Sequence, residues 1–192
     1  MPDSEFMLYQ PPLNTIYASA YGTFTFASGI GPSGSNALTA FPTGTAVSSG
    51  FRSPSGNNGY LLVNPGDTWT FACWYNLAAA TAGQARIQVD QMNNNGVIAA
   101  GTNLGSSFSN AVSYGSAGLA TLTLSVPFGG AVQSLRPNWG SNVAVLGYWW
   151  MSQLYACKES SYSGYQPSAG QVFGGWTTQQ LNSQSLALWV PI

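Results

Sequence analysis

Apolar and polar residues alternate along several short segments of the chain, and Gly, Pro, Asn and Ser separate these segments. A period of two is typical of strands that bury one face, and such breakers mark the turns between strands. No window shows a helical period with caps at both ends, and the nearest candidate, residues 177–189, contains a polar run. We therefore expect an all-β, antiparallel sandwich, with strands at residues 23–26, 60–63, 68–75, 85–92, 97–98, 119–126 and 143–155.

Alternation within these strands divides their side chains between the core and the opposite face. The core is expected to hold Trp69, Phe71, Cys73, Tyr75, Ile87, Val89, Leu122, Leu124, Val126, Tyr148, Trp150 and Leu154. The opposite face then gathers Trp74, Trp149, Met151, Tyr155, Arg86, Gln88, Asp90 and Gln153. Residues 143–155 are long and aromatic, which predicts the central strand of a sheet.

The opposite face suits a sugar, because aromatic rings stack on a pyranose while amides, a carboxylate and a guanidinium bind its hydroxyls. The candidate carbohydrate-binding residues are Trp74, Trp149, Tyr155, Arg86, Gln88, Asp90 and Gln153, joined by Trp139 in an expected loop. The alternative is that residues 8–59, the tail or another subunit covers these aromatics. Arg86 and Asp90 would then form a surface ion pair, and Trp139 would anchor its loop by packing.

The chain is expected to form one domain with peripheral segments. Residues 1–6 precede a second methionine, Met7, and resemble a remnant of a cloning vector. Residues 7–59 form a Gly/Ser-rich N-terminal arm with the first strands, residues 60–168 the core, and residues 169–192 an irregular C-terminal tail.

Charged residues make up 5% of the chain, and without residues 1–6 the net charge moves from −1 to +1. Four basic residues cannot form the cationic stripe that binds phosphates, so nucleic acid is not an expected partner. The longest apolar stretch, residues 143–151, is broken by Gly147 and far shorter than the about 20 residues of a membrane helix. Neither membrane insertion nor a secretory signal is expected.

The residue inventory argues against an enzyme. The chain has no histidine, which removes Ser-His-Asp and Cys-His arrangements and histidine-based zinc sites. Asp67 belongs to the turn Asn64-Pro65-Gly66-Asp67, and nothing brings Asp90 and Glu159 together as a glycosidase pair. Cys73 and Cys157 allow one disulfide, but alternation places them on opposite faces of their strands and favours two buried thiols.

Residues 63–75, VNPGDTWTFACWY, resemble a strand of the carbohydrate-binding-module-like jelly rolls found in bacteriophage tail and minor virion proteins and in glycoside hydrolases. Residues 85–96, 122–127, 147–154 and 162–168 resemble later segments of these domains in the same order. The resemblance implies a jelly-roll sandwich. Many members hold a structural calcium through an acidic residue of the last strand, but residues 149–153 here are WWMSQ, which argues against calcium. No cofactor is predicted.

The resemblance implies a non-catalytic phage virion protein, on the tail or capsid surface, that binds a bacterial surface polysaccharide or other glycan. The alternative is a structural virion subunit, for capsid decoration or tail assembly, whose aromatic face contacts other virion proteins. Low net charge permits the second reading, because it allows close self-association into a homo-oligomer such as a trimer. A third reading is a carbohydrate-binding module from a larger hydrolase.

Overall fold

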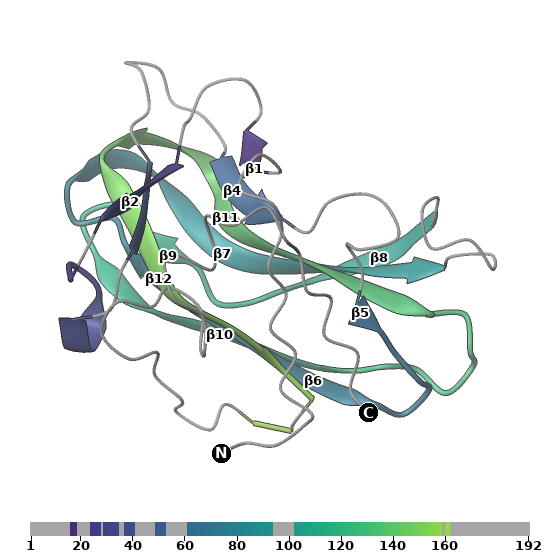
Figure 1. Ribbon diagram of the computed structural model, residues 1–192. Coiled ribbons are helices and arrows are strands. Elements are labelled where there is room, and N and C mark those ends of the chain that lie inside the picture. Colours follow the sequence, from purple (N-terminus) through teal and green to yellow (C-terminus); the bar gives the residue numbers. More distant parts are fainter. Residues whose placement is uncertain are drawn as a thin grey trace.

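The computed structural model describes residues 16–18, 24–27, 29–34, 37–40, 49–52, 61–93, 102–158 and 160–161. In this part of the chain an antiparallel β-sandwich is formed by a seven-stranded and a five-stranded sheet, with one turn of 3-10 helix at Pro32–Gly34. In Figure 1 the long strands of the two sheets lie in two layers, one above the other. The expected all-β jelly-roll sandwich is therefore confirmed.

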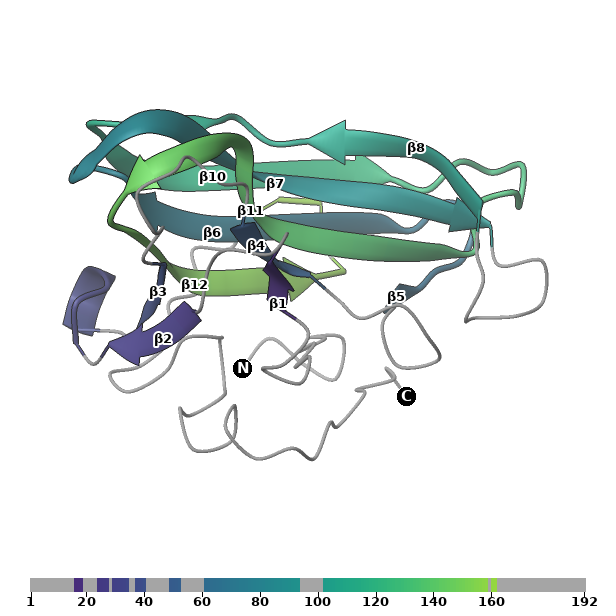
Figure 2. The same ribbon diagram turned by 90° about the horizontal axis from the view of Figure 1, so that it is seen from above.

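The seven-stranded sheet has the order β1-β4-β11-β7-β8, with β5 added to β11 and β9 to β7. The five-stranded sheet has the order β10-β6-β12-β3-β2. Figure 2 shows β1 and β8 at opposite edges of the larger sheet. The strands are β1 (Ile16–Ala18), β2 (Phe24–Ala27), β3 (Ala37–Ala40), β4 (Ser49–Arg52), β5 (Leu61–Leu62), β6 (Thr68–Asn76), β7 (Ala80–Asn93), β8 (Thr102–Phe108), β9 (Val112–Ser113), β10 (Ala117–Ser125), β11 (Ser134–Gly147) and β12 (Trp149–Cys157).

Large aromatic side chains fill the space between the sheets. Trp69 and Phe71 of β6 lie with ring centroids 6.4 Å apart, and Phe71 meets Trp139 of β11 across the sandwich at 6.5 Å. Stacked and tilted ring pairs at such distances stabilise the fold in addition to the effect of burying apolar area. The expected core positions of β6 and β7 are confirmed, as are Leu124, Val126 and Leu154, while Leu122 is partly buried against this core.

The expectation of one central strand at residues 143–155 is wrong. The chain ends β11 in the larger sheet at Gly147 and begins β12 in the smaller sheet at Trp149. Gly147 has φ of +104°, and a Cβ there would lie 3.0 Å from the carbonyl oxygen of Ala79. A residue with a side chain is strained in this conformation, so glycine is suited to the point where the chain changes sheets.

A β-bulge in β12 reverses the alternation of its side chains. Met151 pairs with Tyr75 on the core side, the register shifts between Ser152 and Tyr155, and Gln153 has φ of +54°. An extra residue in one strand changes which parity faces the core. The expected assignment is therefore right after the bulge, where Leu154 is in the core, and wrong before it. There Trp149 and Met151 belong to the core cluster, whereas Trp150 is buried outside this cluster and Tyr148 is half-buried.

Trp139 lies on β11 and not in a loop, which corrects a second expectation. Pro137 and Gly140 beside it gave the impression of a turn. On the side away from β7, the described strands pair with β11 at Ser134–Leu135 and again at Asn138–Gly140. Pro137 falls between these two pairings, where its missing N–H removes no ladder bond to them.

Cys73 is a free thiol, fully buried in the core, as the expectation of unpaired cysteines requires. Burial raises the pKa of the Cys73 thiol far above its ordinary value, so the group stays protonated and packs as a small hydrophobic side chain. The side chain of Cys157 lies outside the described residues, as do the expected strand at 97–98, the candidate helix at 177–189, and segments 1–6 and 169–192.

Strand β10 forms one edge of the smaller sheet and has neither charge nor proline. The Asn110 side chain covers part of this edge: its amide donates to the carbonyl of Leu119 at 3.2 Å, and its oxygen accepts from the N–H of Thr121 at 3.1 Å. The side chain thus occupies the place of a neighbouring strand. Covering an uncharged edge in this way hinders pairing with another chain.

We expect Asn110→Ala to lower the free energy of unfolding by about 1–2 kcal/mol, because two hydrogen bonds to the edge backbone are lost. The open edge should also increase self-association. Urea denaturation and light scattering over a concentration series measure the two effects. Asn103→Ala, at an exposed position of strand β8 in the other sheet, is the control for scattering. A variant that remains as monomeric as the parent would show that Asn110 does not protect the edge.

Candidate functional site

The outer surface of the seven-stranded sheet carries polar side chains on three neighbouring strands. The register aligns Arg136 of β11 with Asp90 of β7 and Ser106 of β8, and in the next row Asn138 with Gln88 and Phe108. Residues that pair in this way point to the same side of a sheet. We call this surface the polar face, and it comprises Arg86, Gln88, Asp90, Ser106, Phe108, Arg136 and Asn138.

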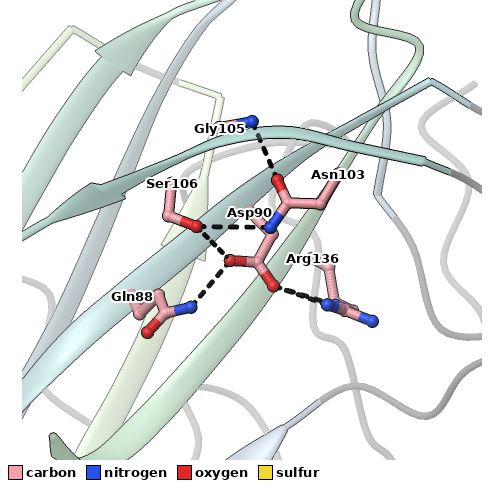
Figure 3. A network of polar contacts seen from close by, with 6 residues as sticks. All are labelled: Gln88, Asp90, Asn103, Gly105, Ser106 and Arg136. Atoms are coloured by element: carbon pink, nitrogen blue, oxygen red, sulfur yellow. Dashed lines mark hydrogen bonds and ion pairs between the residues drawn. The ribbon is translucent and has the colours of Figure 1, made fainter.

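Asp90 is the centre of the polar face (Figure 3). One carboxylate oxygen accepts hydrogen bonds from Gln88 Nε2 at 2.8 Å and Ser106 Oγ at 2.7 Å. The other accepts from Arg136 through Nε at 3.1 Å and a terminal nitrogen at 2.6 Å. Asn103 extends the network by donating to Ser106 Oγ at 3.4 Å. Asp90 is 3% exposed, so these bonds replace the water that a carboxylate needs.

The network keeps Asp90 ionised despite its burial. Burial by itself raises the pKa of a carboxyl group, because it disfavours the charged form. The hydrogen bonds from Ser106, Gln88 and Arg136, together with the charge of Arg136, outweigh this effect and hold the pKa of Asp90 below its ordinary value. Asp90 therefore acts as a fixed anion that orients the side chains above it, and not as a proton donor near neutral pH.

Arg86 and Phe108 form the more accessible part of the polar face. The guanidinium carbon of Arg86 lies 3.7 Å from the ring centroid of Phe108, which is a cation–π contact. Phe108 is 42% exposed, although it is a large apolar side chain at the edge of a sheet. The expected surface ion pair between Arg86 and Asp90 is wrong, because Asp90 pairs with Arg136 and Arg86 stacks on the ring.

The candidate residues of the sequence hypothesis do not share one surface. Arg86, Gln88 and Asp90 lie on the polar face, whereas Trp74 of β6 and Tyr155 and Gln153 of β12 belong to the five-stranded sheet. The alternation predicts on which side of its strand each residue lies, but it does not predict to which of the two sheets the strand belongs. A platform that joins both sets is therefore wrong.

On the five-stranded sheet, Trp74 is half-buried on the side opposite the core, as expected. Tyr155 is 2% exposed, and Gln153 is buried and donates to the carbonyl of Pro32 at 3.4 Å. Trp149 and Trp139 are buried in the core. These four side chains are not open to a sugar in this structure, and the two tryptophans are closed off by the core and not by an arm, a tail or another subunit.

The sequence hypothesis missed four residues of the polar face, namely Ser106, Phe108, Arg136 and Asn138. Strand β8 has the sequence TNLGSSF, whose weak alternation gives little sign of a strand. Arg136 lies beside Pro137, in the segment interpreted as a loop. The sequence did contain one signal for Arg136. Asp90 lies in a strand expected to be buried on one face, where a carboxylate needs a cationic partner, and the chain has few arginines to provide one.

Among the described residues, no three carboxylate, thiol or imidazole side chains lie close enough together to hold a metal ion. The described ranges also contain no helix of the length and apolar character needed to cross a membrane.

No known protein-family model matches the sequence, and no curated protein resembles it closely enough to report. Solved structures resemble the fold. The tandem CBM22-1–CBM22-2 domains of Paenibacillus barcinonensis Xyn10C match 83% of this chain and 51% of theirs, with 11% identity and a TM-score of 0.54. The single CBM22-1 xylan-binding domain of that protein matches 82% of this chain and 94% of its own, with 10% identity and a TM-score of 0.52.

The CBM22-1–GH10 modules of Clostridium thermocellum xylanase 10B, solved with xylohexaose, match 81% of this chain with 8% identity and a TM-score of 0.54. This chain spans 29% of that protein. At such identities the likeness concerns the fold alone. The chain has the jelly-roll fold that is also found in carbohydrate-binding modules of family 22.

Proposed function

We propose that this chain is a non-catalytic glycan-binding module and that the polar face is its binding surface. The observation that carries the proposal is the exposed ring of Phe108, held beside Arg86 and next to the Gln88–Asp90–Arg136 network. A ring with one open face can stack on the apolar face of a sugar. The fixed amide, guanidinium and hydroxyl groups beside it supply directed hydrogen bonds to sugar hydroxyls.

The fold supports the same proposal, because solved structures that share it include xylan-binding modules. Preorganisation supports it as well. The carboxylate of Asp90 is bonded through both oxygens, which limits the rotamers of Gln88 and Arg136 before a ligand arrives. A surface that is ordered in advance loses less side-chain entropy on binding.

The test is a titration of the purified protein with a panel of neutral and acidic polysaccharides, followed by affinity electrophoresis or calorimetry. We expect Phe108→Ala to weaken binding about fivefold to thirtyfold, the usual cost of removing an aromatic anchor. Phe128→Ala is a matched control, because Phe128 is 86% exposed but lies over the turn at Gly66, away from the polar face. Its affinity should equal that of the parent.

Trp74→Ala tests whether the binding surface lies on the five-stranded sheet and not on the seven-stranded one. Loss of affinity in Trp74→Ala with full affinity in Phe108→Ala would move the site to the five-stranded sheet and contradict our assignment. Absence of binding by any glycan of the panel would contradict the proposed function itself.

The sequence resemblance to jelly rolls of bacteriophage tail proteins supports a finer proposal, in which the glycan is a bacterial surface polysaccharide and the chain lies on the surface of a virion. Labelled antibody against this chain should then mark phage particles in electron micrographs. Free protein should also bind host cells and compete with infection. Particles without label would contradict this location and leave glycan binding unaffected.

A second candidate function is a structural virion subunit. Strong exposure of two aromatic side chains favours it, since Phe128 and Tyr114 are 86% and 56% exposed near opposite ends of β6. Exposed apolar side chains of this size are common at contacts between subunits. A stable oligomer in solution that dissociates in Phe128→Ser or Tyr114→Ser, without any glycan binding, would favour this candidate over the first.

A further inference from the structure

The basic residues of this chain are concentrated on one sheet. Three of the four, Arg52, Arg86 and Arg136, lie on the neighbouring strands β4, β7 and β11, and the register places Arg52 opposite Asn138 of the polar face. The fourth, Lys158, pairs with Asp67 at 3.0 Å. The strands of the seven-stranded sheet contain one acidic residue, Asp90. The topology thus brings three of the four basic residues to neighbouring strands of one sheet.

The charges of this group are unequally compensated. Asp90 neutralises Arg136, and both of its oxygens are occupied by Arg136, Gln88 and Ser106. No carboxylate of the described residues reaches Arg86 within ion-pair distance. The guanidinium of Arg86 rests on the ring of Phe108, and its buried Nε has no hydrogen-bond partner in the described part of the chain.

An arginine whose guanidinium packs over an aromatic ring can still use the N–H donors at the rim of the guanidinium to bind another group. These donors match the two oxygens of a carboxylate or another oxyanion, and they bind such a group more strongly than a neutral hydroxyl. Phe108 beside the guanidinium provides the stacking surface for the sugar that carries the anion. Charge and ring thus meet at one point of the polar face.

We propose that the glycan bound by the polar face is acidic, with a carboxylate that pairs with Arg86 while its sugar ring stacks on Phe108. This inference rests on the proposed function and names its substrate class. The single carboxylate of the face, Asp90, does not oppose an incoming anion, because its charge is already paired with Arg136. Uronate-containing polysaccharides have the required chemistry.

The experiment compares polygalacturonate and alginate with their carboxyl-reduced, neutral forms, by calorimetry or affinity electrophoresis at about 0.15 M salt. We expect at least one acidic polymer to bind about tenfold more tightly than its reduced form. Arg86→Gln should weaken acid binding about tenfold and change affinity for the reduced form less than twofold. Arg86→Lys keeps the positive charge but lacks the planar guanidinium. Its affinity for the acidic polymer should lie between those of the parent and Arg86→Gln.

Lys158→Gln is the matched control, because it removes one positive charge that pairs with Asp67 and is not part of the polar face. It should leave both affinities unchanged. Dextran sulfate and single-stranded DNA separate a specific carboxylate site from general attraction to polyanions. Equal or tighter binding of either polymer, or equal losses in Arg86→Gln and Lys158→Gln, would overturn the proposal.

The failures of the two proposals are distinguishable. If the acidic and reduced polymers bind equally and Phe108→Ala weakens both, the preference for acid is wrong and glycan binding on the polar face stands. If neither form of any polymer binds, both proposals are wrong. Unfolding curves for Arg86→Gln and Phe108→Ala, expected within about 1 kcal/mol of the parent, show that lost binding is not lost folding.

Discussion

Trp149→Ala is expected to lower the free energy of unfolding by about 3–5 kcal/mol, which is the usual cost of removing a buried aromatic side chain. Trp149 is completely buried, and its ring centroid lies 6.4 Å from that of Tyr75 at an angle of 46°. Removal leaves a cavity between the sheets that the flanking strands cannot close, because both are fixed by ladders of backbone hydrogen bonds. Urea denaturation followed by far-UV circular dichroism measures the change.

Trp74→Ala is the matched control for this prediction. Trp74 is half-buried on the outer side of the same sheet, so its removal exposes less new apolar surface and leaves no closed cavity. We expect a loss of roughly 1 kcal/mol. Equal losses in the two variants would contradict the core position of Trp149. The plain alternation placed both tryptophans on the outer face and therefore implied similar, small effects in the two variants.

Asp90→Ala is expected to cost about 3 kcal/mol or more of unfolding free energy, because it leaves the partly buried Arg136 without its carboxylate. Gln88 and Ser106 lose an acceptor at the same time. Asp90→Asn keeps the size of the side chain and one acceptor oxygen, so its loss should be smaller. A change of less than 1 kcal/mol in Asp90→Ala would show that the network adds little to stability.

The same network predicts a pH dependence. The pKa of Asp90 in the folded protein lies below its ordinary value of about 3.9, so the folded state binds a proton less readily than the unfolded state. The contribution of ionised Asp90 to the free energy of unfolding is therefore present above about pH 4 and is lost as the pH falls through the pKa of Asp90 in the folded protein. The stability difference between the parent and Asp90→Asn should shrink from pH 6 to pH 3. A constant difference would mean that the charge of Asp90 contributes nothing.

The side-chain orientation predicted from sequence is confirmed on β7 and is inverted over the first part of β12. On β7 the alternation is regular, so Ile87 and Val89 face the core and Arg86, Gln88 and Asp90 face outward. On β12 the bulge at Gln153 inserts one residue and inverts the parity of everything before it. A bulge depends on the register with the neighbouring strand, and residue types leave little trace of it.

The binding partners of each side chain were also beyond the sequence. Arg136 and Asp90 are far apart along the chain, and the two strands that carry them are joined by the register of β11 with β7. The pairing of Arg86 with Phe108 likewise needs β8 beside β7. Local alternation says which side of a strand a residue faces, but the neighbours on that side come from other strands.

Period-two alternation of large apolar residues was enough to predict the class of fold and the core positions of the regular strands, because such residues can be buried only by strands that face another layer. The sequence also shows that the chain has no histidine, which removes the sites that depend on an imidazole. The folded structure alone reveals which strands share a sheet, where the bulge lies and that Asp90 pairs with Arg136 and not with Arg86. These features arise from pairing between distant segments, and that pairing is set by the packing of the whole sandwich and not by any one strand.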